Sequence, residues 1–396
     1  MFDAPSWAER LGGDVFLAQS YFRSHLVVRG KPDDFADLVS WTTLNQVIAT
    51  HRLEPPRLRL SQGGEMVPLR RYAVPVTTRR ATVWHRVQPA ELHARIREGA
   101  SLVIDSIDEI HAPITAAAEG LERFLRTPVQ ANAYASWTAT EGFGTHWDDH
   151  DVVVCQVQGA KRWRIYGPTR PAPTWRDTDT PHIPGGEPLA DVVLSPGDTL
   201  YLPRGWWHAV TADQGTPSLH LTFGLTTQTG ADFMNWIIDQ LRGDVRFRTD
   251  VPRFDTLAAQ RAYVTALREA VVTALDDPAV TGHWARSLDA THHGRPHPSL
   301  PHLDQIPADP DLTVRLTCPR ARLHQNPETG EWTLTAAGTA WDFATPAGPV
   351  LTRLETGQPA TLGELAQHAG LPVTDTAALL TVLVQGQAAA VTGAGR

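Results

Sequence analysis

Two histidines and one aspartate stand at spacings that suit a metal site. His146 and Asp148 are two positions apart where an apolar run begins, so on a strand their side chains project from the same face. His208 begins a later strand, after the turn at 196–198 and the aromatic run "TLYLP". Two histidines and one carboxylate on one face of an octahedral metal, with the other positions open, are the ligands of non-haem Fe(II) oxygenases. The spacing therefore predicts a metal site formed by these three side chains.

Other histidines offer alternatives to this ligand set. His150 continues the same alternation, His182 lies in a loop rich in proline and glycine, and His220 lies in the strand-like "SLHLTFG". An isolated H-x-D pair also arises by chance, and histidines at sheet edges are commonly just solvated. The succession of H-x-D, P-G-D and G-W-W-H is more specific, so we expect the rival histidines to be neighbours of the site or surface residues.

Lys161 is a second unusual residue near this run. The chain has 35 basic residues, and only Lys31 and Lys161 among them are lysines. Lys161 falls on a strand after the "QGA" turn, and a buried ammonium is costly unless it meets an anion. A dicarboxylate that chelates the metal at one end would offer its distal carboxylate to this ammonium. The residues thus favour 2-oxoglutarate as a cosubstrate, and the alternative is an exposed lysine at a strand end.

Three motifs within residues 129–225 together resemble one enzyme family. They are "NAYASWTATEGFGTHWDDHD", "GAKRWRIY" and "PGDTLYLPRGWWHAV". The segment resembles the Jumonji-C, cupin-like 2-oxoglutarate oxygenases, and the whole chain is similar to their ribosomal-oxygenase branch. The resemblance implies Fe(II) as the metal, with 2-oxoglutarate and O2 as cosubstrates. By position, it makes His146, Asp148 and His208 the iron ligands and Lys161 the partner of the distal carboxylate of 2-oxoglutarate.

The resemblance also assigns four polar residues to the neighbourhood of the cosubstrate. It implies that Asn132 and Tyr134 border the cosubstrate or substrate pocket and that Ser218 and Thr222 lie near it. It implies no catalytic residue beyond the metal ligands. The stretch "WTATEGFG" and the loop 169–188 do not match the family's pattern, so we expect these segments to shape substrate choice.

The pattern along the chain predicts a mixed α and β fold. Short runs rich in Val, Leu, Tyr and Trp, separated by Gly, Pro and Asp turns, are typical of an antiparallel barrel. With the resemblance, they predict a double-stranded β-helix (jelly-roll or cupin) barrel. The expected domains are helical and strand decoration of the barrel (1–128), a JmjC/cupin catalytic core (129–229), a helical dimerisation region (230–300) and a winged-helix-like domain (311–396).

Helical periodicity supports several elements outside the barrel. Apolar residues at spacings of three and four predict helices over 89–110, 231–243 and 254–277. Exposed apolar faces on the last two helices would be sticky, so we expect them to pack on the barrel or on a second copy of the chain. Residues 280–310 are rich in histidine and proline and predict a linker.

The C-terminal segment has a winged-helix-like outline. Thr361 and Glu364 form a capping-box pattern that begins a helix, and Gly370 separates it from a second helix. Residues 311–396 carry five arginines and seven acidic residues, whereas a DNA reader needs a basic face. We therefore expect a protein-contact or dimer-supporting module without direct DNA binding.

Composition sets the class of protein. The chain has 396 residues, of which 42% are hydrophobic, and no apolar run approaches the roughly 18 residues that cross a bilayer. The N-terminus has no leader pattern, and Cys155 and Cys318 lie in apolar runs, so we expect a soluble cytoplasmic protein with reduced thiols. The net charge of −8 argues against bulk nucleic-acid binding, although residues 57–98 hold nine arginines against three glutamates. That stretch is either a solvated surface or a patch that steers an acidic or RNA-bound partner.

These observations predict an Fe(II)- and 2-oxoglutarate-dependent dioxygenase. The resemblance favours a homodimer that hydroxylates an arginine or histidine side chain of a ribosomal protein. The first alternative is the same chemistry on a biosynthetic peptide or a small metabolite, or demethylation of N-methyl-lysine. The second is a non-catalytic peptide-binding barrel, which would have no need to keep four costly polar residues inside.

Overall fold

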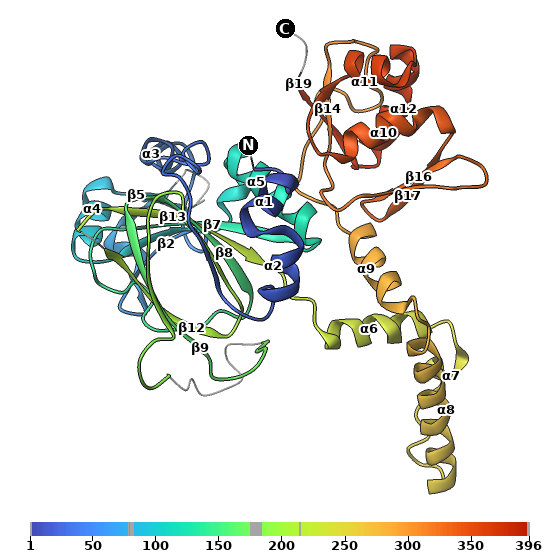
Figure 1. The fold of residues 1–396 in the computed structure, drawn as a ribbon, viewed down its shortest axis with the longest axis horizontal. Coiled ribbons are helices and arrows are strands. Elements are labelled where there is room, and N and C mark those ends of the chain that lie inside the picture. Colours follow the sequence, from blue (N-terminus) through green and yellow to red (C-terminus); the bar gives the residue numbers. More distant parts are fainter. Residues whose placement is uncertain (1, 78, 80–82, 175–183, 214, 394–396) are drawn as a thin grey trace. The chain divides into compact units, whose positions relative to one another are not determined.

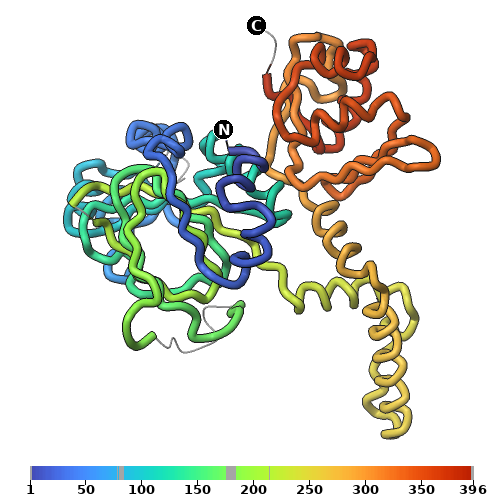
Figure 2. The backbone as a smooth tube through the Cα atoms, viewed as in Figure 1, coloured from blue at the N-terminus to red at the C-terminus, as the bar shows by residue number. Residues whose placement is uncertain are grey.

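The chain forms two compact units, which the computed structural model describes separately. They are Met1–Thr227 and Gln228–Arg396, and Figure 1 and Figure 2 trace the elements of each. The described residues are 2–77, 79, 83–174, 184–213 and 215–393. None of the helices in this described part is both long and apolar enough to cross a membrane.

The first unit contains two antiparallel sheets whose strands curve around a common interior (Figure 1). The larger sheet has the strand order β1-β11-β8-β13-β7-β6-β2-β3, and the smaller has the order β10-β9-β12. The bounds are β1 Leu26–Val28, β2 Leu58–Gln62, β3 Glu65–Met66, β6 Ser101–Ile104, β7 Val129–Ser136, β8 Asp151–Gln158, β9 Ala160–Pro168, β10 Ala190–Leu194, β11 Thr199–Leu202, β12 Trp206–Asp213 and β13 Ser218–Leu225. A separate hairpin consists of β4 (Ala73–Thr77) and β5 (Val83–Val87).

Side-chain alternation on β9 explains why this sequence forms a barrel wall. Lys161, Trp163 and Ile165 are buried on one face, whereas Arg162 and Arg164 on the other face are partly exposed. Arg162 forms a bidentate ion pair with a carboxylate of the neighbouring strand β10, at 2.7 Å for each hydrogen bond. The inward face of β9 therefore holds Lys161, the predicted cosubstrate-binding residue, and the outward face is solvated.

Strand register places the polar residues of β7 and β13 in cross-strand pairs. His220 is paired with Tyr134, and Thr222 is paired with Asn132. Because alternate residues share a face, these pairs follow one another along the interior of the barrel. Lys161 on β9 belongs to the opposite, smaller sheet.

Helices cover the outside of the larger sheet. Their bounds are α1 Ala4–Leu11, α2 Gly13–Gln19, α3 Trp41–Thr50, α4 Pro89–Arg97 and α5 Ala112–Leu125. The carboxylate of Asp3 accepts the Ser6 N–H at 3.0 Å and so caps the first turn of α1. The fully buried Trp7 donates its indole N–H to the carbonyl oxygen of Ala117 at 2.8 Å, which ties α1 to α5.

The helix predicted over 89–110 is only partly correct. The helix α4 ends at Arg97, and the apolar run that follows forms the strand β6 between β2 and β7. All four residues of β6 are buried. A short apolar run with β-branched residues is compatible with both structures, and here pairing on both edges favours the strand.

The second unit begins with helices and ends in a small mixed domain. The helices are α6 Gly230–Leu241, α7 Val245–Arg248, α8 Leu257–Leu275 and α9 Val280–Ala290. The mixed part contains the sheets β18-β14-β19 and β15-β16-β17 and three helices. Their bounds are β14 Thr313–Leu316, β15 Arg322–Gln325, β16 Trp332–Ala336, β17 Thr339–Phe343, β18 Ala360–Thr361, β19 Ala389–Gly393, α10 Gly348–Glu355, α11 Leu362–Ala369 and α12 Val373–Gln385.

Two predictions for this unit have different outcomes. The capping box is confirmed, because the side chains of Thr361 and Glu364 each accept a backbone N–H at the start of α11. The linker predicted over 280–310 is wrong in its first part, because α9 occupies Val280–Ala290. Buried Asp289 at the end of α9 forms an ion pair with Arg322 at 2.6 Å, which fixes this helix to β15.

Candidate metal centre and active site

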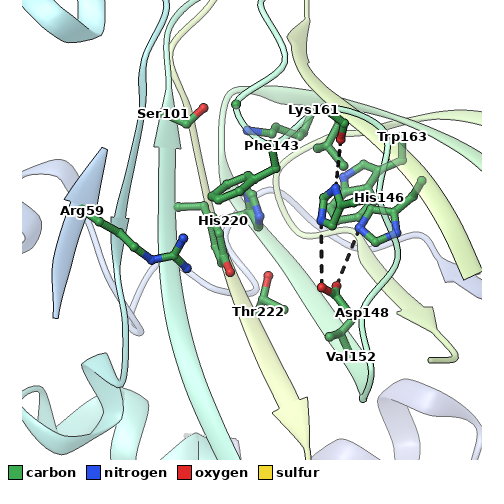
Figure 3. A pocket seen from close by; sticks show the side chains of 15 residues that line it. Arg59, Ser101, Phe143, His146, Asp148, Val152, Lys161, Trp163, His220 and Thr222 are labelled. Carbon is green, nitrogen blue, oxygen red and sulfur yellow. Dashed lines mark hydrogen bonds and ion pairs between the residues drawn. The ribbon is translucent and has the colours of Figure 1, made fainter. Parts of the chain in front are cut away.

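His146, Asp148 and His208 meet at one point inside the barrel (Figure 3). One ligand atom of each lies within 4.8 Å of the others. Asp148 Oδ1 lies 3.9 Å from His146 Nε2, and Asp148 Oδ2 lies 3.7 Å from His208 Nε2. The structure therefore brings together the three residues that the sequence predicted as a metal site.

Backbone carbonyls fix the orientation of both imidazole rings. The Nδ1 atom of His146 lies 2.9 Å from the Gly144 carbonyl oxygen, and the Nδ1 atom of His208 lies 2.9 Å from the Trp206 carbonyl oxygen. With the proton on Nδ1, each ring donates to its carbonyl and presents the lone pair of Nε2 toward Asp148. This donor set, two imidazole nitrogens and one carboxylate, fits a divalent transition metal.

A pocket extends from the three ligands into the barrel (Figure 3). Both sheets line it, since β9 and β12 contribute one wall and β7 and β13 contribute the other. The lining residues beyond the three ligands are Arg59, Ser101, Tyr134, Gly142, Phe143, Gly144, Val152, Lys161, Trp163, Val210, His220 and Thr222. Among the described residues of this lining, Asp148 is the only acidic one, so the rest of the described lining favours an anion.

Lys161 is buried in this pocket without a carboxylate partner in the described chain. Its side chain donates a hydrogen bond to Ser136 Oγ at 2.6 Å, and the residue is only 4% exposed. Burial lowers the pKa of Lys161 to about 7, because a low dielectric disfavours the charged ammonium. An anion that entered the pocket would restore the charged form.

His220 and Tyr134 stack on each other beside Lys161. Their ring centroids lie 4.9 Å apart, and the rings are nearly parallel. Burial and the charge of Lys161 lower the pKa of His220 well below its usual range, so the imidazole is neutral. Burial and the charge of Asp148 raise the pKa of Tyr134 to about 12, so the phenol keeps its proton.

The other two polar residues assigned by resemblance lie beyond the pocket lining. Asn132 shares the inward face of β7, but its Oδ1 atom accepts the backbone N–H of Ser106 at 2.9 Å. Ser218 is fully buried, and its Oγ atom lies 2.9 Å from the Gln156 side-chain nitrogen. Tyr134 and Thr222, by contrast, line the pocket.

The rival histidines lie outside the group of three ligands. The imidazole of His150 is 40% exposed and contacts the carboxylate of Asp149 at 3.0 Å. His220 lines the pocket but does not belong to the group whose ligand atoms meet. His182 lies outside the described residues.

Sequence reasoning did not identify Arg59 and Phe143 as site residues. Arg59, on β2, forms a bidentate ion pair with Asp105 at 2.6 and 3.1 Å. Its guanidinium lies 5.4 Å from the ring centroid of Phe143, which in turn lies 5.8 Å from the ring of His146. Figure 3 shows the Arg59 side chain reaching into the pocket. The arginine excess of residues 57–98 gave a signal that did not distinguish Arg59 from its neighbours. Phe143 lies in the stretch "WTATEGFG", which the sequence predicts to shape substrate choice without singling out this residue.

Ion pairs occupy several arginines of that excess. Arg57 pairs with Glu109, and Arg95 pairs with Glu98 at 2.8 Å, in addition to the pair between Arg59 and Asp105. Asp105 and Glu109 lie outside residues 57–98, so these two carboxylates reduce the positive charge that the sequence alone indicated for that stretch.

Comparisons with known proteins agree with this geometry. Residues 109–233 match the family model of the JmjC domain. The bifunctional lysine-specific demethylase and histidyl-hydroxylase NO66 of Drosophila persimilis is 35% identical over 143 residues, which are 36% of this chain and 21% of that protein. Ribosomal oxygenase 1 of Homo sapiens is 35% identical over 143 residues, which are 33% of this chain and 22% of that protein. The chain thus matches about a fifth of the length of these relatives.

Solved structures extend the comparison beyond this segment. Escherichia coli YcfD, a ribosomal oxygenase determined in complex with cobalt and 2-oxoglutarate, is 18% identical with a TM-score of 0.59. The alignment covers 96% of this chain and 98% of that protein. This similarity is one of fold. The resemblance to the Jumonji-C oxygenases is confirmed, as is the mixed α and β, cupin-like fold.

Proposed function

We propose that the protein is an Fe(II)- and 2-oxoglutarate-dependent oxygenase that hydroxylates a protein side chain. One observation carries this proposal. The three ligand side chains and the buried ammonium of Lys161 line the same pocket, and Asp148 is the only acid that the described part of the chain contributes to it. A metal at one end and a lysine at the other suit a short dicarboxylate. The names of the relatives and the JmjC match support the same chemistry.

His146, Asp148 and His208 would hold the iron. Both histidine rings are already oriented by carbonyl oxygens, so Nε2 is available on each without a change of tautomer. Fe(II) bound there supplies the activation of O2 that a side chain cannot provide. The contribution of this chain would be to hold the three ligand side chains together at the metal.

Lys161 would bind the distal carboxylate of 2-oxoglutarate. Its ammonium is held by Ser136 at 2.6 Å and is nearly excluded from water. An ion pair in this environment is less screened than one at the surface. A buried lysine without an anion is costly, which argues against the alternative of a non-catalytic barrel.

The substrate we propose is an arginine or histidine residue of a ribosomal protein. The names of the relatives, ribosomal oxygenase and histidyl-hydroxylase, support this choice. Phe143 and Arg59 give the pocket lining an aromatic and a cationic surface beside each other. An RNA contact by residues 57–98 stays a prediction, as does a cytoplasmic location.

A homodimer and a winged-helix-like C-terminal domain also belong to this proposal. The helix α8 carries large apolar side chains that are widely exposed within this chain, among them Leu257 at 71% and Val264 at 62%. A second copy that covers this face would remove apolar surface from water. Sedimentation velocity at micromolar concentration tests the dimer, and a clean monomer would contradict it.

The first test of the activity is anaerobic titration of the protein with Fe(II) and 2-oxoglutarate. We expect the visible metal-to-ligand charge-transfer band of a chelated 2-oxo acid. Asp148→Ala should abolish the band, and Lys161→Ala should require far more 2-oxoglutarate to develop it. A wild-type protein without the band would contradict the proposed chemistry. Incubation with ribosomal subunits, followed by intact-mass analysis for the addition of one oxygen atom, then tests the substrate class.

A further inference from the structure

Two buried nitrogen atoms in the pocket have no hydrogen-bond partner among the described residues. They are the indole Nε1 of Trp163 and Nδ1 of His220. Both side chains are only 4% exposed, and both line the pocket that contains Lys161. Buried polar atoms in folded proteins are almost always hydrogen-bonded, so two exceptions in one cavity call for an explanation.

The strands explain why both atoms reach the same cavity. Trp163 follows Lys161 by two residues on β9, so the two side chains share the inward face. Its ring centroid lies 5.5 Å from that of His208 and 5.9 Å from that of His220. Trp163 is therefore next to both His208 and His220, and Figure 3 shows it on the same side of the pocket as Lys161.

A purely structural role does not account for these nitrogens. A phenylalanine at position 163 would fill the barrel without burying an N–H group, and the same holds at position 220. Other buried tryptophans in the chain have partners for their indole nitrogen. Trp7 donates to Ala117 at 2.8 Å, and Trp207 donates to Thr169 at 2.7 Å. The difference indicates that the partner of Trp163 is a ligand of the pocket.

We infer that the indole N–H of Trp163 and the Nδ1–H of His220 donate hydrogen bonds to bound 2-oxoglutarate, in addition to Lys161. The inference rests on the proposed function, because it takes 2-oxoglutarate as the occupant. A dicarboxylate offers only acceptors, and Lys161, Trp163 and His220 offer donors. Burial and the charge of Lys161 keep the pKa of His220 low, so the ring is neutral and has one N–H to give. Trp163 and His220 are thereby cosubstrate-binding residues.

The test measures the Kd of 2-oxoglutarate by calorimetry, with Zn(II) in place of Fe(II) so that no turnover occurs. Trp163→Phe keeps an aromatic ring and removes the N–H. We expect the Kd to rise by about ten- to a hundredfold, the range for loss of a hydrogen bond to a charged group. Zn(II) affinity without 2-oxoglutarate is measured in parallel, because Trp163 packs on His208. It should stay within about twofold of wild type.

Trp7→Phe is the matched control, since it removes a buried indole N–H that already has a protein partner. It should lower the Tm of the ligand-free protein and leave the Kd of 2-oxoglutarate unchanged. Trp163→Phe should show the opposite pattern, with an unchanged or higher ligand-free Tm and weaker binding. The two variants should thus differ in both the ligand-free Tm and the Kd of 2-oxoglutarate. This difference distinguishes the loss of a ligand contact from a general loss of packing.

Two substitutions test His220 in the same way. His220→Phe keeps the stack on Tyr134 and should raise the Kd of 2-oxoglutarate by about tenfold or more. His220→Asn places an amide N–H close to the position of Nδ1, so it should recover part of the lost affinity. An unchanged Kd for His220→Phe would overturn the role of His220, because it would mean that the aromatic ring suffices without the N–H.

Nuclear magnetic resonance gives a readout that does not depend on affinity. In protein labelled with ¹⁵N-tryptophan, the indole signal missing from Trp163→Phe identifies Trp163. We expect this signal to shift downfield when 2-oxoglutarate is added to the Zn(II) protein. An unshifted signal together with an unchanged Kd for Trp163→Phe would overturn the inference. If Lys161→Ala still weakened binding, the proposed function would stand. A wild-type protein that did not bind 2-oxoglutarate would overturn both.

Discussion

His146 and His208 exchange both of their backbone hydrogen bonds, at 3.0 and 2.8 Å, although they come from distant parts of the chain. This isolated bridge holds the two imidazoles at the same level of the barrel, with ring centroids 4.4 Å apart. Asp148 lies between their Nε2 atoms. The ligand positions are therefore set by the backbone, and a metal does not have to assemble them.

Asp148→Ala should remove metal binding without unfolding the protein. The substitution deletes one of three ligands, and we expect metal affinity to fall by more than the 10- to 100-fold of a typical outer-shell change. The backbone bridge remains, so the Tm of the metal-free protein should change by less than about 3 °C. Thermal unfolding with and without Zn(II) measures both effects. A metal-free Asp148→Ala protein that is already unfolded would contradict this separation of ligand and scaffold.

Gly159 is required for the turn that leads into β9 and Lys161. Its φ of +66° lies in the left-handed region, and a Cβ atom there would overlap the carbonyl oxygen of Pro217. Gly159→Ala should lower the free energy of unfolding by about 2 kcal/mol or more and weaken 2-oxoglutarate binding, because β9 must shift. Denaturant unfolding and calorimetry measure the two changes.

Gly215→Ala is the control for this glycine. Gly215 has nearly the same φ, +65°, but a Cβ there would meet no atom of the described residues within 4 Å. Only the backbone strain applies, so we expect a loss of about 1 kcal/mol and an unchanged Kd for 2-oxoglutarate. Similar losses for the two variants would show that the contact with Pro217 is unimportant.

Sequence reasoning identified the site residues that belong to short motifs in a fixed order along the chain. His146, Asp148, His208 and Lys161 all meet in one pocket as predicted, because strand alternation decides which side chains face inward. Alternation alone could not tell how deep each residue lies or what else it contacts. Asn132 faces inward as well, but Ser106 engages its side chain.

The parts that sequence reasoning missed depend on contacts between distant segments. Arg59 reaches the pocket because β2 pairs with β6, and β6 pairs with β7. Nothing local marks Arg59 among nine arginines in residues 57–98. The same cause explains the error at β6, where pairing with two strands outweighed a helical pattern. Local periodicity carries no information about which distant strands pair. That pairing brought Arg59 to the pocket and made the residues of β6 a strand.

Arg59 should affect the substrate more than the cosubstrate. Asp105 binds its guanidinium from one side and Phe143 packs near the other. Arg59→Gln removes a charged hydrogen-bond donor from the pocket lining. We expect the KM to rise by about tenfold for a ribosomal substrate whose carbonyl oxygen or neutral imidazole accepts a hydrogen bond from Arg59. The Kd of 2-oxoglutarate should stay within about twofold of wild type. Initial rates of hydroxylation and calorimetry separate the two effects, and equal weakening of both would argue against a substrate contact.

Lys161 should make 2-oxoglutarate binding depend on pH. Burial holds its pKa at about 7, whereas a bound carboxylate favours the charged ammonium and raises this pKa. Affinity is therefore full below about pH 7 and falls by up to about tenfold for each pH unit above it, because binding must then take up a proton. Calorimetry in buffers of different ionisation enthalpy measures the affinity and the proton uptake together. A Kd that is independent of pH between about 6.5 and about 8.5 would contradict this coupling.

The same burial gives the ligand-free protein a stability that rises with pH. The pKa of Lys161 is lower in the folded protein than the usual 10.5, so between about pH 7 and about pH 10.5 the unfolded chain binds the extra proton. The free energy of unfolding then increases with pH across this window, as far as Lys161 contributes. Lys161→Met should remove this contribution and raise the stability of the ligand-free protein most strongly at or below pH 7, while it weakens 2-oxoglutarate binding by about 100-fold. Urea unfolding of both proteins at several pH values measures the difference. A Lys161→Met protein that was less stable than wild type at neutral pH would show that the ammonium has a stabilising partner in the ligand-free protein. It would then contradict the idea that Lys161 needs a bound anion.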